Sequence, residues 1–141
     1  MQIAGHGWRI AVQDLEQAMG QNRSLHSHRL RYAQAAPVQV SETAFANANS
    51  DVAARLARWL LMCHDRVEGD DIPLTHEFIA MMLGVRRPGV TVALPVLEGM
   101  QIIRATHGVI TVLDREKLEG LTDEAYGLSE AEYTRLMGME P

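Results

Sequence analysis

The chain has 141 residues, 47% of them hydrophobic and 22% charged, which is the composition of a globular protein with one domain, or one domain and an appended segment. Its 11 glycines and 5 prolines are too few for a collagen-like or low-complexity chain, and its single cysteine excludes an internal disulfide framework and CxxC-type metal sites. The net charge of −5 argues against nucleic-acid binding only if the charges are evenly spread.

The charges are in fact unevenly spread along the chain. Residues 120–141 contain five acidic residues and one basic residue, whereas residues 86–107 contain three arginines and one acidic residue. Salt screens exposed charges beyond about 10 Å, so an acidic tail does not prevent a basic face elsewhere. No segment reaches the roughly 18 apolar residues of a membrane span, and the start lacks the features of a signal peptide. We therefore expect a cytoplasmic protein with no membrane contact.

The first 49 residues predict a strand followed by two helices. Residues 3–12 are typical of a strand or strand end, and Asp14 is a good cap for a short helix that Gly20 ends. Residues 23–46 are alanine-rich and predict a helix with a kink or break near Pro37, because proline in a helix interior costs about 3 kcal/mol. The heptad pattern sought there, at 25, 29, 32, 36, 40 and 43, is weak.

Residues 51–66 predict an amphipathic helix, with Ser50 as its N-cap and Asp51 at its positive end. Its apolar face consists of residues at helical spacing: Val52, Leu56, Trp59, Leu60 and Cys63. The acidic run at 68–71, followed by Pro73, predicts a loop.

Next comes a short predicted helix that Thr75 caps and Gly84 ends in the left-handed conformation. Its expected buried side is formed by Phe78, Ile79, Met82 and Leu83.

A second helix is predicted only a few residues later, with Pro88 in its first turn and Gly99 at its end. Its inner stripe consists of Val90, Ala93, Leu94 and Leu97. The β-rich runs IIRAT and VITVL then flank His107 and Gly108, which predicts a hairpin.

The spacing of three residues indicates how the two short helices meet. Ala80 is small enough for a close crossing, Gly84 allows the tight turn, and Val90 packs the second helix on the first. Counted from His76, these are positions five, nine and fifteen of a helix-turn-helix, and the hairpin that follows is a wing. In this arrangement the second helix enters the major groove of DNA, which is about 12 Å wide.

The run LTHEFIAMMLGVRRPGVTVALPVLE, preceded by ARLARWLLMCHDR and followed by GMQIIRATHGVITVLDREKLE, resembles the C-terminal winged-helix domain of Crp/Fnr-type transcription regulators. The resemblance implies a mainly α fold with a small β wing, in which a long dimerisation helix precedes the winged helix-turn-helix domain. It divides the chain into a remnant of a cyclic-nucleotide-binding-like sensor barrel with a short helix (1–22), a dimerisation helix and hinge (23–49), the DNA-binding domain (50–120) and a helical tail (121–141).

Most of the sensor barrel has no counterpart in these residues, so the effector cannot be identified, and the chain is either a fragment or a natural short form. The resemblance implies sequence-specific binding of double-stranded DNA by a homodimer, with RNA polymerase as a further partner. The operator sequence, and the choice between activation and repression, stay open.

The resemblance also assigns roles on the second helix. Arg87 matches the family's arginine near the start of the recognition helix and can bind guanine O6 and N7 bidentately. Arg86 is expected to meet a phosphate, and Thr91 a thymine methyl group or a phosphate. Pro88 stands where the family often has an acidic base reader, and Val92 stands in place of a basic one, so the family's half-site should not be transferred.

Other contacts are expected outside that helix. Thr106 and His107 at the wing tip either donate to phosphate or are simply a polar hairpin tip. Thr75 can contact a phosphate, although capping is the preferred role. Pro95, which opposes the carbonyl of Thr91, predicts a kink or a short reading segment in the recognition helix.

No cofactor, metal or enzymatic activity is expected. His26 and His28 are two residues apart and diverge on a helix, and Cys63 with His64 has the same difficulty. Cys63 is interpreted as a small buried hydrophobic residue. No phosphate loop, GxSxG or HExxH motif is present.

Residues 129–137 predict a short amphipathic helix, capped by Ser129, that packs on the body or on a dimer partner. The alternative function is a protein-interaction or dimerisation module that kept the fold and lost specific DNA reading. Pro88, Val92, Pro95 and the net negative charge motivate it.

Overall fold

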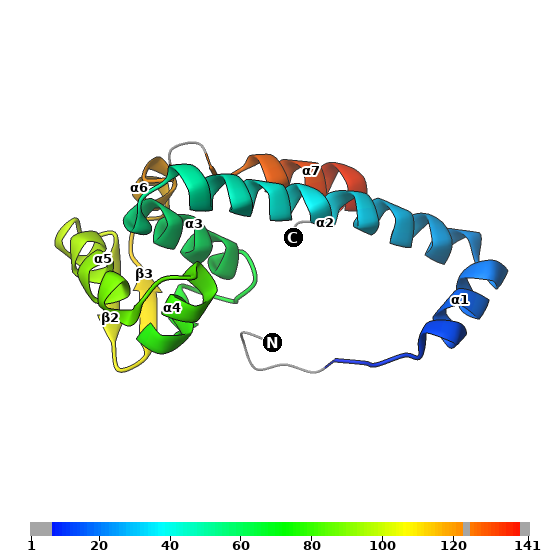
Figure 1. Cartoon of the computed structure of the whole chain (residues 1–141), viewed down its shortest axis with the longest axis horizontal. Helices are drawn as coiled ribbons and strands as arrows, with labels where there is room; N and C mark the ends of the chain where they lie inside the picture. The colour runs from blue at the N-terminus through cyan, green and yellow to red at the C-terminus, as the bar shows by residue number, and fades with distance from the viewer. Residues whose placement is uncertain (1–6, 123–124, 139–141) are drawn as a thin grey trace.

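A computed structural model describes residues 7–122 and 125–138. The molecule has a winged-helix body and a long helical arm that extends away from it (Figure 1). In chain order the elements are α1 (Val12–Gln21), α2 (Arg23–Asn49), α3 (Val52–His64), β1 (Asp71–Pro73), α4 (His76–Leu83), α5 (Arg87–Gly99), β2 (Ile103–Thr106), β3 (Val109–Val112), α6 (Arg115–Gly120) and α7 (Leu128–Met137).

The core of the body lies between α3, α4, α5 and the sheet. All four residues of the predicted inner stripe of α5 are buried, as are Leu56 and Leu60 on α3 and Ile79 on α4. Burying an aliphatic side chain of this size stabilises the fold by about 1.5–3 kcal/mol. This packing holds α5 in place from behind and leaves its other side in solvent.

The sheet is antiparallel, with strand order β1-β3-β2. Thr106 pairs with Val109, and both residues between them, His107 (φ 49°) and Gly108 (φ 82°), have positive φ angles, as a tight type I′ hairpin turn requires. The predicted wing is therefore confirmed. The predicted loop is wrong at residues 71–73, where β1 buries Ile72 opposite Ile110 and keeps Pro73 on an edge strand, a place where proline is tolerated.

The helix termini around α3 and α4 differ slightly from prediction. Asp51, not Ser50, caps α3 by accepting a hydrogen bond from the Ala54 N–H at 2.8 Å. The Ser50 N–H instead bonds the Ala46 carbonyl and ends α2. Thr75 and Gly84 (φ 62°) cap α4 as predicted.

The predicted buried side of α4 is only partly right. Ile79 and Leu83 are buried, and Phe78 packs against Trp59 with ring centroids 6.1 Å apart. The prediction that Met82 is buried is wrong: it is 38% exposed, because it lies at an open hollow that Trp59 and Cys63 of α3 also line.

The arm differs most from prediction. Residues 7–11 form no strand and are exposed, while residues 1–6 lie outside the described residues. α1 starts at Val12 with Asp14 already in its first turn, and it passes through Gly20. The break near Pro37 is also wrong, because α2 is one helix of 27 residues. Proline removes only one backbone hydrogen bond, and the turns on both sides of it keep theirs.

α7 packs along α2, so the predicted C-terminal helix lies on its own chain (Figure 1). Ala35, Leu136 and Met137 form a small buried cluster there, with Tyr133 against it. Ser129 is not the cap: α7 follows Gly127, whose N–H donates to Glu130 Oε2 at 2.9 Å. In the described part of the chain no single helix is long and apolar enough to cross a membrane, and only α4 and α5 taken together across a sharp bend reach that length and hydropathy.

Candidate nucleic-acid interface

The turn between α4 and α5 sets the position of α5. The two helices are bent by 106° relative to each other, within the range typical of a helix-turn-helix. The Val85 N–H bonds the Ala80 carbonyl at 3.0 Å, and the Arg55 side chain on α3 donates to the Leu83 carbonyl. Ala80 and Val90 are buried where the helices cross. The predicted roles of Ala80, Gly84 and Val90 are thus confirmed, and α3 anchors the turn from behind.

Two arginines stand at the exposed start of α5. Arg86 is the N-cap residue, Arg87 is the first helical residue, and both side chains are exposed. Neither guanidinium group has an ion-pair partner within residues 7–122 and 125–138. Arginine presents a planar fork of donors that matches phosphate oxygens and the guanine edge. The front of α5 is therefore cationic and accessible.

Beyond its first turn the outer face of α5 is apolar. Val92 is 69% exposed and Val96 is 48% exposed. With Pro88 and with Val52 of α3 they line a shallow hollow of about 570 Å³. The Thr91 hydroxyl bonds the Arg87 carbonyl at 3.1 Å, which leaves its methyl group for outward contact.

Pro95 does not shorten α5, although its position predicts a kink or a short reading segment. The helix continues through it to Gly99, and Pro95 itself is exposed. The inner side of α5 keeps its packing because Leu94 and Leu97, on either side of Pro95, are both buried. The outer face is therefore continuous from Arg87 to Val96.

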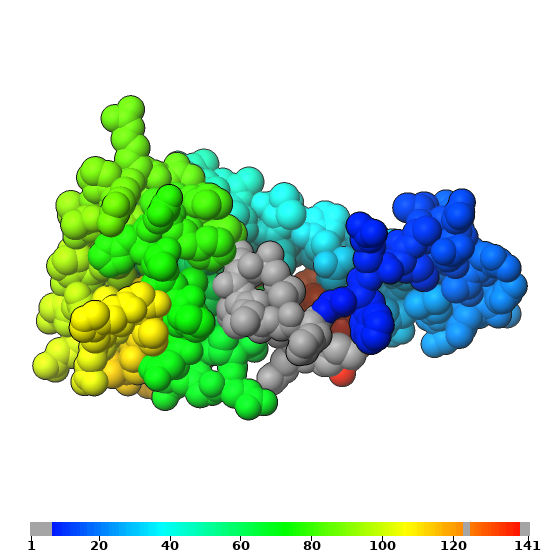
Figure 2. Space-filling view, turned by 90° about the horizontal axis from the view of Figure 1, so that it is seen from below, coloured from blue at the N-terminus to red at the C-terminus, as the bar shows by residue number. Residues whose placement is uncertain are grey.

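The wing tip lies against the start of α4. The Leu74 N–H donates to the Gly108 carbonyl at 2.8 Å, and a Cβ atom at Gly108 would stand 3.9 Å from Thr75 Cγ2. Thr106 and His107 are exposed at the tip, and the Thr75 hydroxyl accepts from the Phe78 N–H at 3.2 Å. These three polar residues thus gather at one edge of the body, where Figure 2 shows the hairpin beside α4.

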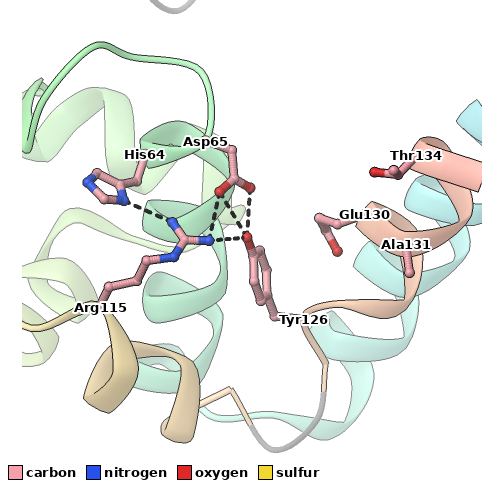
Figure 3. A pocket seen from close by; sticks show the side chains of 7 residues that line it. All are labelled: His64, Asp65, Arg115, Tyr126, Glu130, Ala131 and Thr134. Carbon is pink, nitrogen blue, oxygen red and sulfur yellow. Dashed lines mark hydrogen bonds and ion pairs between the residues drawn. The ribbon is translucent and has the colours of Figure 1, made fainter. Parts of the chain in front are cut away.

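A second cluster of polar residues joins α3, α6 and the segment before α7 (Figure 3). Arg115 donates to Asp65 at 2.8 Å, to the Tyr126 hydroxyl at 2.7 Å and to His64 Nδ1 at 2.9 Å. Because arginine only donates, His64 Nδ1 accepts and Nε2 donates to Asp70 at 3.0 Å. Burial, together with the bond to Asp65, raises the pKa of Tyr126. The cluster is a structural joint, and it lies beside a hollow of about 540 Å³ that Glu130 and Thr134 line from α7.

Cys63 and His64 behave as structural residues. Cys63 is buried, as predicted, and burial raises the pKa of its thiol to about 11. In the described ranges no three His, Cys, Asp or Glu residues lie close enough to hold a metal ion. Sequence reasoning missed the positioning roles of Arg55, Arg58 and Arg115; for Arg58 the available signal was a charge on a nearly all-apolar helix.

Comparison with known proteins identifies the domain and its fold. Residues 54–121 match the family model of the Crp-like helix-turn-helix domain, and no curated protein sequence matches the chain. Among solved structures, it resembles a putative Crp/Fnr-family transcriptional regulator from Eubacterium rectale, with 23% identity, a TM-score of 0.63, and 82% of this chain and 53% of that chain covered. It also resembles FixK2 from Bradyrhizobium japonicum, with 23% identity, a TM-score of 0.64, and coverage of 77% and 57%.

A Crp-family transcriptional regulator from Thermus thermophilus is similar at 24% identity, with a TM-score of 0.57 and coverage of 63% and 49%. The chain therefore spans about half the length of these proteins. At such identities the likeness establishes the fold, and the family model identifies the domain. Residues 54–121 are a Crp-like helix-turn-helix domain, and the chain shares with these solved structures the fold of a long helix that leads into a winged helix.

Proposed function

We propose that this chain is a transcription regulator that binds specific DNA sequences as a homodimer, with α5 in the major groove. The observation that carries the proposal is the pair Arg86 and Arg87 at the start of α5. Both are exposed and have no ion-pair partner among the described residues, and α5 is bent by 106° from α4. Arg87 reads a guanine through its fork, and Arg86 neutralises a phosphate. Thr75, Thr106 and His107 contact the sugar-phosphate backbone of the DNA beside the wing.

The apolar face of α5 offers a second way to recognise bases. Val92 and the Thr91 methyl group follow Arg87 by one helical turn on the exposed side. In the major groove, apolar side chains recognise the C5-methyl group of thymine. We therefore propose a half-site in which a guanine is followed by thymine-containing pairs.

The net negative charge of the chain is compatible with this interface. Glu130 and Glu132 lie on α7, which packs along α2 on the other side of α3 from α5 (Figure 1). The DNA-facing start of α5 is cationic at Arg86 and Arg87. Binding is expected to weaken steeply with salt, because each neutralised phosphate releases counterions.

The homodimer is supported by a free seam on α2. Leu30, Ala33, Pro37, Val40 and Ala44 follow alternating steps of three and four residues, and all are exposed. Ala35, which packs on α7, is turned about 140° from Leu30 around the helix. The seam is thus on the side of α2 that α7 leaves open, and its spacing is that of a two-helix interface.

One observation favours a second candidate function, a module that binds proteins and not DNA. Val92 and Val96 give α5 an exposed apolar strip of the kind that partner proteins bury. The test below separates the two functions.

The primary test is selection of duplexes from a randomised pool by the purified chain. We expect enrichment of an inverted repeat whose half-sites are about 10–10.5 base pairs apart, with a dissociation constant of about 10⁻⁸ M or tighter at physiological salt. If no sequence is enriched and all duplexes bind with about 10⁻⁴–10⁻⁶ M, the non-specific range, the protein-binding function is favoured.

Thymine recognition is tested by replacing thymine with deoxyuridine in the selected duplex, which deletes only the methyl group. Affinity should fall for wild type, and the fall should disappear in Val92→Ala. Equal affinity of wild type for the two duplexes would remove Val92 from the reading face without affecting the role of Arg87.

The dimer is tested by sedimentation of Val40→Glu in the α2 seam, with Ser24→Glu, an exposed position on the opposite side of α2, as the matched control. We expect a monomer for Val40→Glu and a dimer for wild type and the control. A wild-type monomer at micromolar concentration would contradict the proposed pairing.

A further inference from the structure

Arg58 is a buried cation that has no ion-pair partner among the described residues. Its side chain extends from the middle of α3, and the residue is only 4% exposed. Nε donates to the Ala125 carbonyl at 2.6 Å, and Nη1 lies 3.1 Å from both Thr43 Oγ1 and Met62 Sδ. Nη2 is buried and has no hydrogen-bond partner in residues 7–122 and 125–138. No ion pair links Arg58 to a carboxylate within the described ranges.

This state is unusual, because buried charges in proteins are normally paired. Burial lowers the pKa of Arg58, and the negative charges of Glu130 and Glu42 oppose that effect only from a distance. Glu130 Oε2 already accepts hydrogen bonds from the Gly127 N–H and the Ser129 hydroxyl. A buried donor left without a partner calls for an explanation such as a bound anion.

Arg58 lines a hollow of about 420 Å³ where α2, α3 and α7 meet. A second cation, Arg66, lines the same hollow, and in the described part of the chain no acidic side chain does. Hydroxyl and amide groups of Thr43 and Gln39 lie on its α2 side, and the rings of Trp59 and Tyr133 provide flat apolar surface. The volume is within the range of sites for small organic molecules.

We propose that this hollow binds a small organic acid, with its carboxylate or phosphate group on Arg58 and Arg66 and an aromatic or apolar body against Trp59 and Tyr133. Guanidinium forks bind such oxyanions through two parallel hydrogen bonds. The ligand supplies the negative charge that the guanidinium group of Arg58 finds on no described residue.

The position of the hollow gives binding a structural consequence. Its lining residues come from the arm (Gln39, Thr43), from α3 and the turn that follows it (Arg58, Arg66) and from α7 (Tyr133). A ligand that contacts all three ties the arm to the winged helix. The site is separate from the DNA-facing side of α5, so binding can be measured without DNA.

The experiment uses the fluorescence of Trp59 in the full chain carrying Trp8→Phe, since Trp8 is fully exposed and would contribute an unrelated signal. Benzoate and phenyl phosphate are the anionic probes, and benzamide is the neutral probe of similar shape. We expect saturable fluorescence changes with one or both anions, and benzamide at least about tenfold weaker. Thermal unfolding of wild type should shift upward with the same anions, because a ligand that binds only the folded state stabilises it.

Two variants localise the binding. Arg66→Gln removes the exposed cation of the hollow and should weaken anion binding about tenfold, whereas Arg104→Gln on β2 removes the same charge elsewhere and should not. Arg58→Lys keeps the buried charge without the fork and should weaken binding as well. The proposal is overturned if neither anion changes fluorescence or melting temperature at about 10 mM, if benzamide binds equally well, or if Arg104→Gln weakens binding as much as Arg66→Gln.

Discussion

The winged-helix body and the helical arm obtain their stability in different ways. Among the described residues, the body core contains 20 buried hydrophobic residues from α3 to α6, whereas the contact between α2 and α7 buries three. The arm also leaves Leu30, Val40 and Phe45 exposed. The body is thus a self-sufficient packing unit, while the arm has apolar surface that α7 does not cover.

The first prediction compares a truncation in each region. Leu60→Ala removes a fully buried side chain of the body and should cost about 2–5 kcal/mol of unfolding free energy. Leu136→Ala, in the small cluster at α2, should cost about 2 kcal/mol or less, because fewer neighbours surround it. Urea denaturation followed by circular dichroism measures both, and equal losses would contradict the distinction between the regions.

Pro37→Ala tests whether the stability of the arm is independent of that of the body. The new N–H can donate to the Ala33 carbonyl, and removal of the proline ring relieves a helix-interior cost of about 3 kcal/mol at most. We expect slower hydrogen exchange in α2 and unchanged exchange in α3 and α5. Slower exchange throughout the body would mean that the two regions unfold as one unit.

Thr75→Ala tests a site residue that belongs to the body. Loss of the cap on α4 should cost about 1 kcal/mol, and Thr75→Ser should restore most of it. If Thr75→Ala lowers DNA affinity more than Thr75→Ser at matched fractions of folded protein, the hydroxyl contacts phosphate as well. Identical stability of Thr75→Ala and wild type would exclude the capping role.

The buried thiol of Cys63 makes the stability of the body depend on pH. Its thiol pKa is about 11 in the folded chain and 9.0 as the ordinary value, so the folded pKa is raised. The corresponding stability is fully present below pH 9 and is lost as pH rises towards 11. A thiol reagent at pH 8 should therefore label Cys63 far more slowly in native protein than in urea, and equal rates would show that α3 opens readily.

The sequence was sufficient to predict the parts of the fold that depend on local rules. Gly84 could only end a helix in the left-handed conformation, and the run from Val90 to Leu97 has the period of a buried helix face. The wing followed from His107 and Gly108 between two β-rich runs.

The features that were missed depend on tertiary contacts. β1 has only three residues and forms because Ile72 pairs with Ile110, which is 38 positions away in the sequence. The burial of Arg58 likewise depends on a neighbour from another segment, the Ala125 carbonyl. The continuity of α2 through Pro37 has a local reason, because proline removes only one backbone hydrogen bond. At the candidate interface, the motif located Arg86 and Arg87, but their exposure and the apolar strip behind them required the packed structure.

The most direct test of the account is a comparison of Arg87→Ala with wild type on two duplexes. One duplex is the selected site, and in the other the guanine assigned to Arg87 is replaced by adenine in both half-sites. Wild type should prefer the guanine duplex by about tenfold or more per half-site. Arg87→Ala should bind the two duplexes equally weakly. Lys117→Ala on α6 is the control and should show the same preference as wild type. If Arg87→Ala keeps the full preference for guanine, α5 does not read DNA through this arginine, and the central claim fails.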